Sequence, residues 1–131
     1  MRDTGMLILR VCMAVVFIGH GLQAVFGAFG GPGIDGFAHA LSGLGFKPAL
    51  MWAYIGGLTE LIGGICLLLG LITRIAAFFI FVFITVAAVK VHVAKGFFLQ
   101  SGGIEYTFVI ACVCAAIMLL GPGKFSIMKK L

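Results

Sequence analysis

Ionisable and amide side chains lie within or at the ends of long apolar runs of this sequence, where such groups are rare. They are Arg10, His20, Gln23, Glu60, Lys90, His92 and Glu105. A charge at the centre of a bilayer costs about 2.5–3.5 kcal/mol on insertion scales, so these groups are candidates for function. Histidines and carboxylates in apolar surroundings suit proton transfer to and from a lipophilic molecule. We expect catalytic roles for Glu60, His20 and His92, and ligand binding by Gln23, Lys90, Glu105 and Arg10.

Glu60, His20 and Gln23 also have structural interpretations. Gly56 and Gly64 lie four residues before and after Glu60 on the same helical face, where glycines let a neighbouring helix approach closely. The Glu60 carboxylate therefore either takes part in chemistry or locks two helices together. His20 and Gln23, three residues apart, share a face and either line a site or pack inside the protein.

The remaining candidates lie nearer the ends of the apolar runs. Lys90 and His92 diverge by roughly 160° on an ideal helix, so one can face inward while the other extends to the interface. Glu105 begins the fourth run, where a carboxylate also complements the helix dipole. Arg10 lies about one turn inside the first run, and it either extends to the cytoplasmic interface or pairs with an acid or a ligand anion.

The composition indicates that lipid surrounds the chain. Of the 131 residues, 63% are hydrophobic and 10% are charged, against about 45–50% and about 25% in soluble domains. We expect a single membrane domain over residues 1–131. The net charge of +5 is expected to orient the chain in the membrane and not to bind nucleic acid, because Lys129-Lys130 is the only basic run outside the apolar segments. The four cysteines form no CxxC pair and are expected to pack as small hydrophobic residues, with a redox or metal role left open and no metal site predicted.

Four apolar runs predict an all-α fold, a bundle of four transmembrane helices, at about 7–26, 49–72, 75–93 and 104–120. Each is near the roughly 20 residues that cross a bilayer, and none alternates as barrel strands do. Apolar residues at helical spacing predict a short amphipathic helix in the first outer loop, 27–48.

Lysines and arginines predict the orientation of this bundle. One side carries Arg2, Arg10, Arg74, Lys124, Lys129 and Lys130, and the other carries Lys47, Lys90 and Lys95. The richer side is expected to be cytoplasmic, which places both termini inside and the loops 27–48 and 94–103 outside. The polar candidates other than Glu60 and Arg10 then lie in the outer half of the membrane, with Glu60 just below them. We expect these outer-half groups to share one pocket, which the segment 27–48 covers.

Five segments resemble the DoxX family of small four-helix membrane proteins, in order over nearly the whole chain. They are 17–23 (FIGHGLQ), 59–74 (TELIGGICLLLGLITR), 92–98 (HVAKGFF), 102–106 (GGIEY) and 121–126 (GPGKFS). The resemblance implies positions that match family motifs at His20, Glu60, His92 and Glu105. It also implies a redox context, because the family is named after a subunit of a thiosulfate:quinone oxidoreductase. Nucleotide and hydrolase motifs such as the Walker loop, HExxH and GxSxG are absent.

Three functions follow as hypotheses. The first is an integral membrane subunit of an oxidoreductase that interacts with quinone, in which His20, His92 and Glu60 supply hydrogen bonds and protons while Lys90 or Arg10 stabilises an anion. The second is a non-catalytic scaffold or assembly partner, whose polar groups lock helices together. The third is a haem-bearing subunit with His20 and His92 as axial ligands. The expected partners are the lipid of a bacterial or archaeal inner membrane and either a protein subunit or a second copy of the chain.

Overall fold

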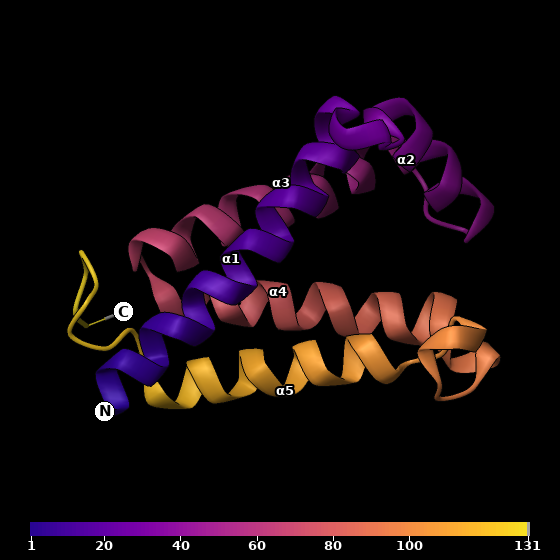
Figure 1. The fold of residues 1–131 in the computed structure, drawn as a ribbon. Helices are drawn as coiled ribbons and strands as arrows, with labels where there is room; N and C mark the ends of the chain where they lie inside the picture. Colours follow the sequence, from indigo (N-terminus) through magenta and orange to yellow (C-terminus); the bar gives the residue numbers. More distant parts are fainter. Residues whose placement is uncertain (131) are drawn as a thin grey trace.

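The computed structural model describes residues 1–130, and its long elements are all helices. They are α1 (Arg2–Phe26), α2 (Gly33–Gly43), α3 (Ala49–Leu69), α4 (Thr73–Ala87) and α5 (Glu105–Leu120) (Figure 1). The chain continues beyond α4 through a π-helical turn, Ala88–His92, and a 3₁₀ turn, Val93–Lys95. The described residues contain no strand, which confirms the all-α fold class.

Three of these helical segments are long and apolar enough to cross a membrane: Arg2–Phe26, Ala49–Leu69 and Thr73–Lys95. The helix α5 is also apolar but has only 16 residues. Several membrane-spanning helices are therefore present, whereas the fourth span remains a prediction.

The long helices form two packed pairs. The helix α1 packs on α3, α4 packs on α5, and α3 and α4 join the pairs. The pairs lie close together near the N-terminus and the C-terminal segment, and they diverge towards the other end of the molecule (Figure 1). The helix α2 lies at this diverging end and packs against α3 and α1. The amphipathic helix predicted within 27–48 thus corresponds to α2.

Glycine allows α1 and α3 to approach almost to backbone contact. A Cβ atom placed on Gly21 would lie 2.6 Å from the Leu61 backbone nitrogen, and one on Gly64 would lie 2.9 Å from the Ile18 backbone nitrogen. Small residues at helix crossings are typical of membrane proteins, where helices associate by close packing. This crossing fixes the position of the middle of α3, which carries Glu60.

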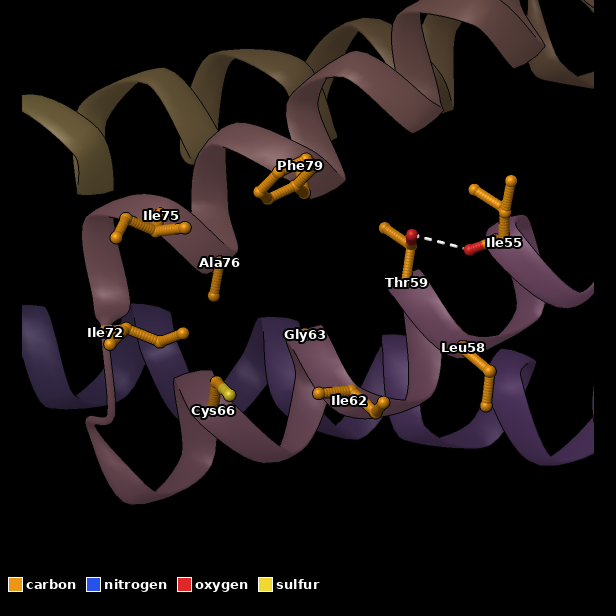
Figure 2. A pocket seen from close by; sticks show the side chains of 10 residues that line it. All are labelled: Ile55, Leu58, Thr59, Ile62, Gly63, Cys66, Ile72, Ile75, Ala76 and Phe79. Atoms are coloured by element: carbon orange, nitrogen blue, oxygen red, sulfur yellow. Dashed lines mark hydrogen bonds between the residues drawn. The ribbon is translucent and has the colours of Figure 1, made fainter.

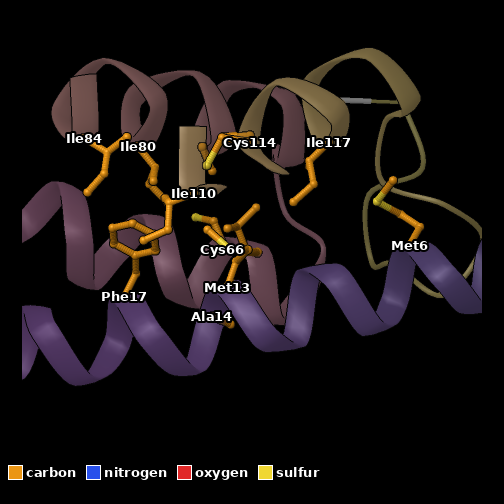
Figure 3. Packing of buried hydrophobic residues seen from close by; sticks show 13 residues of the cluster. Met6, Met13, Ala14, Phe17, Cys66, Ile80, Ile84, Ile110, Cys114 and Ile117 are labelled. Atoms are coloured by element: carbon orange, nitrogen blue, oxygen red, sulfur yellow. The ribbon is translucent and has the colours of Figure 1, made fainter. Parts of the chain in front are cut away.

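The hydrophobic core lies where the two helix pairs converge. Its largest fully buried apolar side chains are Phe17, Leu67, Ile80 and Ile117. Cys66 and Cys114 belong to the same cluster and are free thiols, as the packing interpretation predicts (Figure 3), whereas Cys12 and Cys112 are exposed. The core therefore holds the terminal end of the bundle together and leaves the diverging end more open.

Candidate functional site

An aromatic-walled cavity of about 480 Å³ lies between α2, α3 and α4 at the diverging end of the molecule. We call it the aromatic chamber. Its larger lining side chains are Phe37, Leu41, Leu44, Phe46, Trp52, Phe79, Phe83 and Lys90. Gly56 is also in the wall, and a Cβ atom there would lie 3.1 Å from Phe83 Cε2 and 3.3 Å from the Phe37 ring. The glycine thus brings both rings close to α3, so that the chamber has flat apolar walls.

Lys90 is the one charged residue among the lining residues that the structure describes. It lies in the π-helical turn Ala88–His92, and its Nζ atom is 5.7 Å from the centre of the Phe46 ring. A lysine ammonium over an aromatic face is stabilised by the ring and keeps its hydrogen-bond donors. The chamber therefore combines apolar walls with a single cationic donor, and π-helical turns are frequent at functional sites.

A second hollow of about 360 Å³ runs between α3 and α4 (Figure 2). We call it the α3–α4 groove. Its lining residues are Ile55, Leu58, Thr59, Ile62, Gly63, Cys66, Ile72, Ile75, Ala76 and Phe79. Ile55, Thr59 and Phe79 line the chamber as well, so the two hollows adjoin. Thr59 Oγ1 donates a 2.6 Å hydrogen bond to the Ile55 carbonyl, which leaves the junction effectively apolar.

Glu60 follows Thr59 on α3 and is buried, with 8% of its surface exposed. It lies between the pairs Gly56–Gly57 and Gly63–Gly64, all of which are buried. The burial agrees with the inward position expected from the sequence. Within residues 1–130, however, no side chain on another helix forms a direct hydrogen bond or ion pair with its carboxylate.

His20 and Gln23 lie on α1 and do not line the chamber. His20 is exposed, and Gln23 is half-buried beneath Gly31, whose added Cβ would clash with it. The helices α1 and α3 run antiparallel, and Gly21 lies against Leu61. His20 precedes Gly21 and Glu60 precedes Leu61. In an antiparallel pair the side chains of these two preceding residues point to the same side of the helix crossing.

His92 and Glu105 stabilise the connection between α4 and α5. His92 Nδ1 is 2.7 Å from the Gly102 carbonyl oxygen, and Glu105 Oε2 accepts a 2.9 Å hydrogen bond from the Leu99 backbone N–H. Both side chains are thus engaged by the main chain of the loop that they border, and neither lines the chamber.

Arg10 is almost completely buried, with 1% of its surface exposed. It donates four hydrogen bonds of 2.8–3.1 Å to carbonyl oxygens of Leu67, Leu68, Pro122 and Phe125. Of the two alternatives for Arg10, extension to the interface is wrong, because these carbonyls at the end of α3 and in the C-terminal segment satisfy the guanidinium inside the protein. Arg10 lies at the converging end, away from the chamber.

Among the polar residues predicted from the sequence, Lys90 lines the chamber and the others do not. One pocket shared by all of these residues stays a prediction. Sequence reasoning missed the aromatic lining, for which the signals were the 13 phenylalanines and the amphipathic segment. Clusters of three or more histidine, cysteine or acidic residues are absent from the part of the chain that the structure describes.

All residues that line the two hollows lie in the region that matches a known family. The DoxX family model matches residues 5–93, a region that contains α1 from Gly5 onward, α2 to α4, and every residue lining the chamber and the groove. The chain belongs to the DoxX family and is a multi-pass membrane protein. Searches of curated proteins and of solved structures found no match.

Proposed function

We propose that this protein is an integral membrane subunit of an oxidoreductase and that it binds quinone in the aromatic chamber. The observation that supports this proposal is the chamber itself, a cavity of about 480 Å³ with aromatic walls and one ammonium group. Ligand pockets in proteins have volumes of about 300–1,000 Å³ and pair apolar walls with a few polar groups. The chamber has this composition.

The chemistry of a quinone ring fits the chamber residues. A flat ring stacks between side chains such as Phe37 and Phe83, and its carbonyl oxygen accepts a hydrogen bond from Lys90. Reduction of a quinone to a quinol takes two electrons and two protons. The electrons would come from a partner protein, either another subunit or a second copy of the chain. For the protons we propose Glu60, which follows Thr59 of the chamber wall, together with His20 and His92.

The membrane arrangement of this subunit is part of the proposal. Four spans with both termini in the cytoplasm place the chamber in the outer half of the membrane. The helix α2 then covers the chamber from the outside, because Phe37 and Leu41 line it. We propose a bacterial or archaeal inner membrane as the location.

A scaffold or assembly partner is the second candidate function. It is favoured by the polar groups that are satisfied within the chain, namely the Arg10, His92 and Glu105 hydrogen bonds. The haem alternative has no comparable support. His20 lies on α1 and His92 at the end of α4, and these elements diverge at that end of the molecule (Figure 1).

The chain contains a single tryptophan, Trp52, and it lines the chamber. Quinones quench tryptophan fluorescence at short range, so Trp52 is a built-in reporter. We expect a soluble quinone analogue to quench Trp52 saturably in protein purified into lipid nanodiscs, with a Trp52→Phe variant giving the background. A scaffold without a quinone site would show only the weak linear quenching that results from collisions in the lipid.

A further inference from the structure

The chamber and the groove differ in polarity along one continuous path. Lys90, whose ammonium lies over the Phe46 ring, lines the chamber, whereas the groove is lined by apolar side chains, Thr59 with its internally bonded hydroxyl, and the thiol of Cys66. The path along α4 from Lys90 to Ile75 is 15 residues, or roughly 22 Å at about 1.5 Å each. A ligand that fills the path has a polar head at one end and a long apolar chain at the other.

The groove faces the lipid, so such a ligand does not need an aqueous entrance. Ile62 and Phe79 line the groove and are 54% and 56% exposed. Gly63 on α3 and Ala76 on α4 line it with the smallest side chains (Figure 2), which leaves space between the two helices. The groove is therefore a shallow channel on the lipid-facing surface that leads from α4 residue Ile75 to the chamber.

We propose that a lipid-soluble quinone enters from the bilayer between α3 and α4, with its ring against Lys90 in the chamber and its apolar tail in the α3–α4 groove. This inference rests on the proposed function and adds the entry route, the orientation of the ligand and the segment that holds its tail. Hydrogen bonding supports the orientation, because the acceptor oxygens of such a ligand lie on its ring and not on its hydrocarbon tail. Lys90 is the charged donor that lines the path.

Photo-crosslinking tests the orientation directly. Two quinone analogues are used with the full chain in nanodiscs, one with a photoreactive group on the ring and one with it at the end of the tail. The ring probe is expected to label chamber residues such as Phe83 and Trp52. The tail probe is expected to label groove residues between 62 and 76. An excess of unlabelled quinone should reduce both signals several-fold.

A matched pair of variants tests the groove. Ile62→Phe adds bulk to the groove, whereas Ile65→Phe makes the same change on the lipid-exposed surface of α3 outside it. We expect Ile62→Phe to lower competed tail labelling several-fold and to leave ring labelling unchanged, while Ile65→Phe changes neither. Both variants keep Trp52, so saturable quenching shows whether the chamber still binds the ring.

The outcomes separate the two proposals. Equal tail labelling of groove residues and of lipid-facing residues such as Ile65 or Phe78, together with saturable Trp52 quenching, would overturn the entry route and leave the quinone subunit standing. The absence of both saturable quenching and competed labelling would overturn the proposed function and this inference with it.

Discussion

In the proposed quinone site, Lys90 is the residue that we expect to orient the ligand. Its ammonium is held over the Phe46 ring at the end of a pocket whose other walls are apolar. Apolar walls alone hold a ring without fixing its direction, and a single charged donor supplies that direction. The role of Lys90 is therefore separable from that of the aromatic walls.

Lys90→Met is expected to weaken binding of the quinone analogue by about tenfold or more, because a hydrogen bond from a charged group contributes about 1.5–3 kcal/mol. The measurement is the concentration dependence of Trp52 quenching. Lys95→Met is the control, since Lys95 lies at the same end of α4 but does not line the chamber. Equal binding by the two variants would remove Lys90 from the site.

Glu60 is a buried carboxylate without a partner in the described chain, and this determines what its replacement does. Removing one partner of a buried ion pair leaves a stranded charge and is strongly destabilising. Replacing Glu60 strands no partner, and it removes the cost of burying a carboxylate. We expect Glu60→Leu to fold with a thermal midpoint within a few degrees of the wild type. If Glu60 supplies a proton, the variant also loses quinone reduction while it still quenches Trp52.

Glu60→Gln separates the shape of the side chain from its proton. It keeps the hydrogen-bonding shape but does not release a proton near neutral pH. Full quinone reduction by Glu60→Gln, measured with the partner that supplies electrons, would exclude Glu60 from proton transfer. A large loss of stability in Glu60→Leu would instead indicate that the carboxylate locks two helices together.

At the scale of elements, Arg10 connects three segments at the converging end of the bundle. Its guanidinium bonds the last carbonyls of α3 and the segment after α5, and two backbone bonds, Ile127 N–H to the Leu69 carbonyl and Met128 N–H to the Gly70 carbonyl, extend the same contact. Gly70 makes room for this contact, because its φ is +72° and an added Cβ would lie 2.6 Å from Arg10 Nη2.

Arg10→Met is expected to lower the free energy of unfolding by about 3 kcal/mol or more, since each buried carbonyl left unpaired costs about 1–3 kcal/mol. Arg2→Met is the control, because Arg2 is exposed and makes one 3.1 Å bond to the Leu120 carbonyl. We expect that variant to lose less than about 1 kcal/mol. Unfolding in a denaturing detergent, followed by circular dichroism, measures both. A loss of similar size in the two variants would contradict the role assigned to Arg10.

The elements themselves could be predicted from the sequence because a helix that crosses lipid is apolar along most of its length. Continuous apolar runs of about 20 residues identify spans, and apolar residues at helical spacing with flanking glycine clusters identified α2. The ends were less accurate: α1 begins at Arg2, although the apolar run begins at residue 7, and α3 ends at Leu69 although the second run continues to 72. Gly70 in a left-handed conformation ends α3 early, a local effect that hydropathy does not register.

The site was harder to predict than the spans, for a physical reason. In a chain where most residues are apolar, the few polar side chains are the natural candidates for a site. Main-chain carbonyls at helix ends and in loops can satisfy such side chains instead, as Arg10 and His92 show. A chamber lined by phenylalanines has no distinctive sequence pattern, because the same residues also face lipid. Only the divergence of the helix pairs, a property of the packed structure, separates lining from lipid-facing rings.

At the scale of the whole molecule, both ends of the chain lie at the same end of the bundle. Asp3 Oδ1 accepts a 3.1 Å hydrogen bond from the Lys124 backbone N–H, and Arg2 bonds the end of α5. The 16 residues of α5 cover roughly 24 Å, somewhat less than the apolar core of about 30 Å, but α5 packs along α4. We therefore expect α5 to cross the membrane as a fourth span.

Topology reporters test this expectation. A reporter at residue 131 and one at the N-terminus should both be cytoplasmic, as the distribution of lysine and arginine predicts. A reporter inserted within Gly30–Gly33 should lie on the opposite side. A C-terminal reporter on the same side as the one in Gly30–Gly33 would show that α5 does not span, and the four-helix topology would be wrong.

The central claim is that a quinone binds between α2, α3 and α4, and an experimental density map of the protein with a quinone analogue tests it most directly. We expect density for the ring in the aromatic chamber within hydrogen-bonding distance of Lys90 Nζ, and density for the tail along the α3–α4 groove. Ring density beside His20 and Glu60 between the diverging helix pairs, with the chamber filled by side chains or lipid, would contradict the claim.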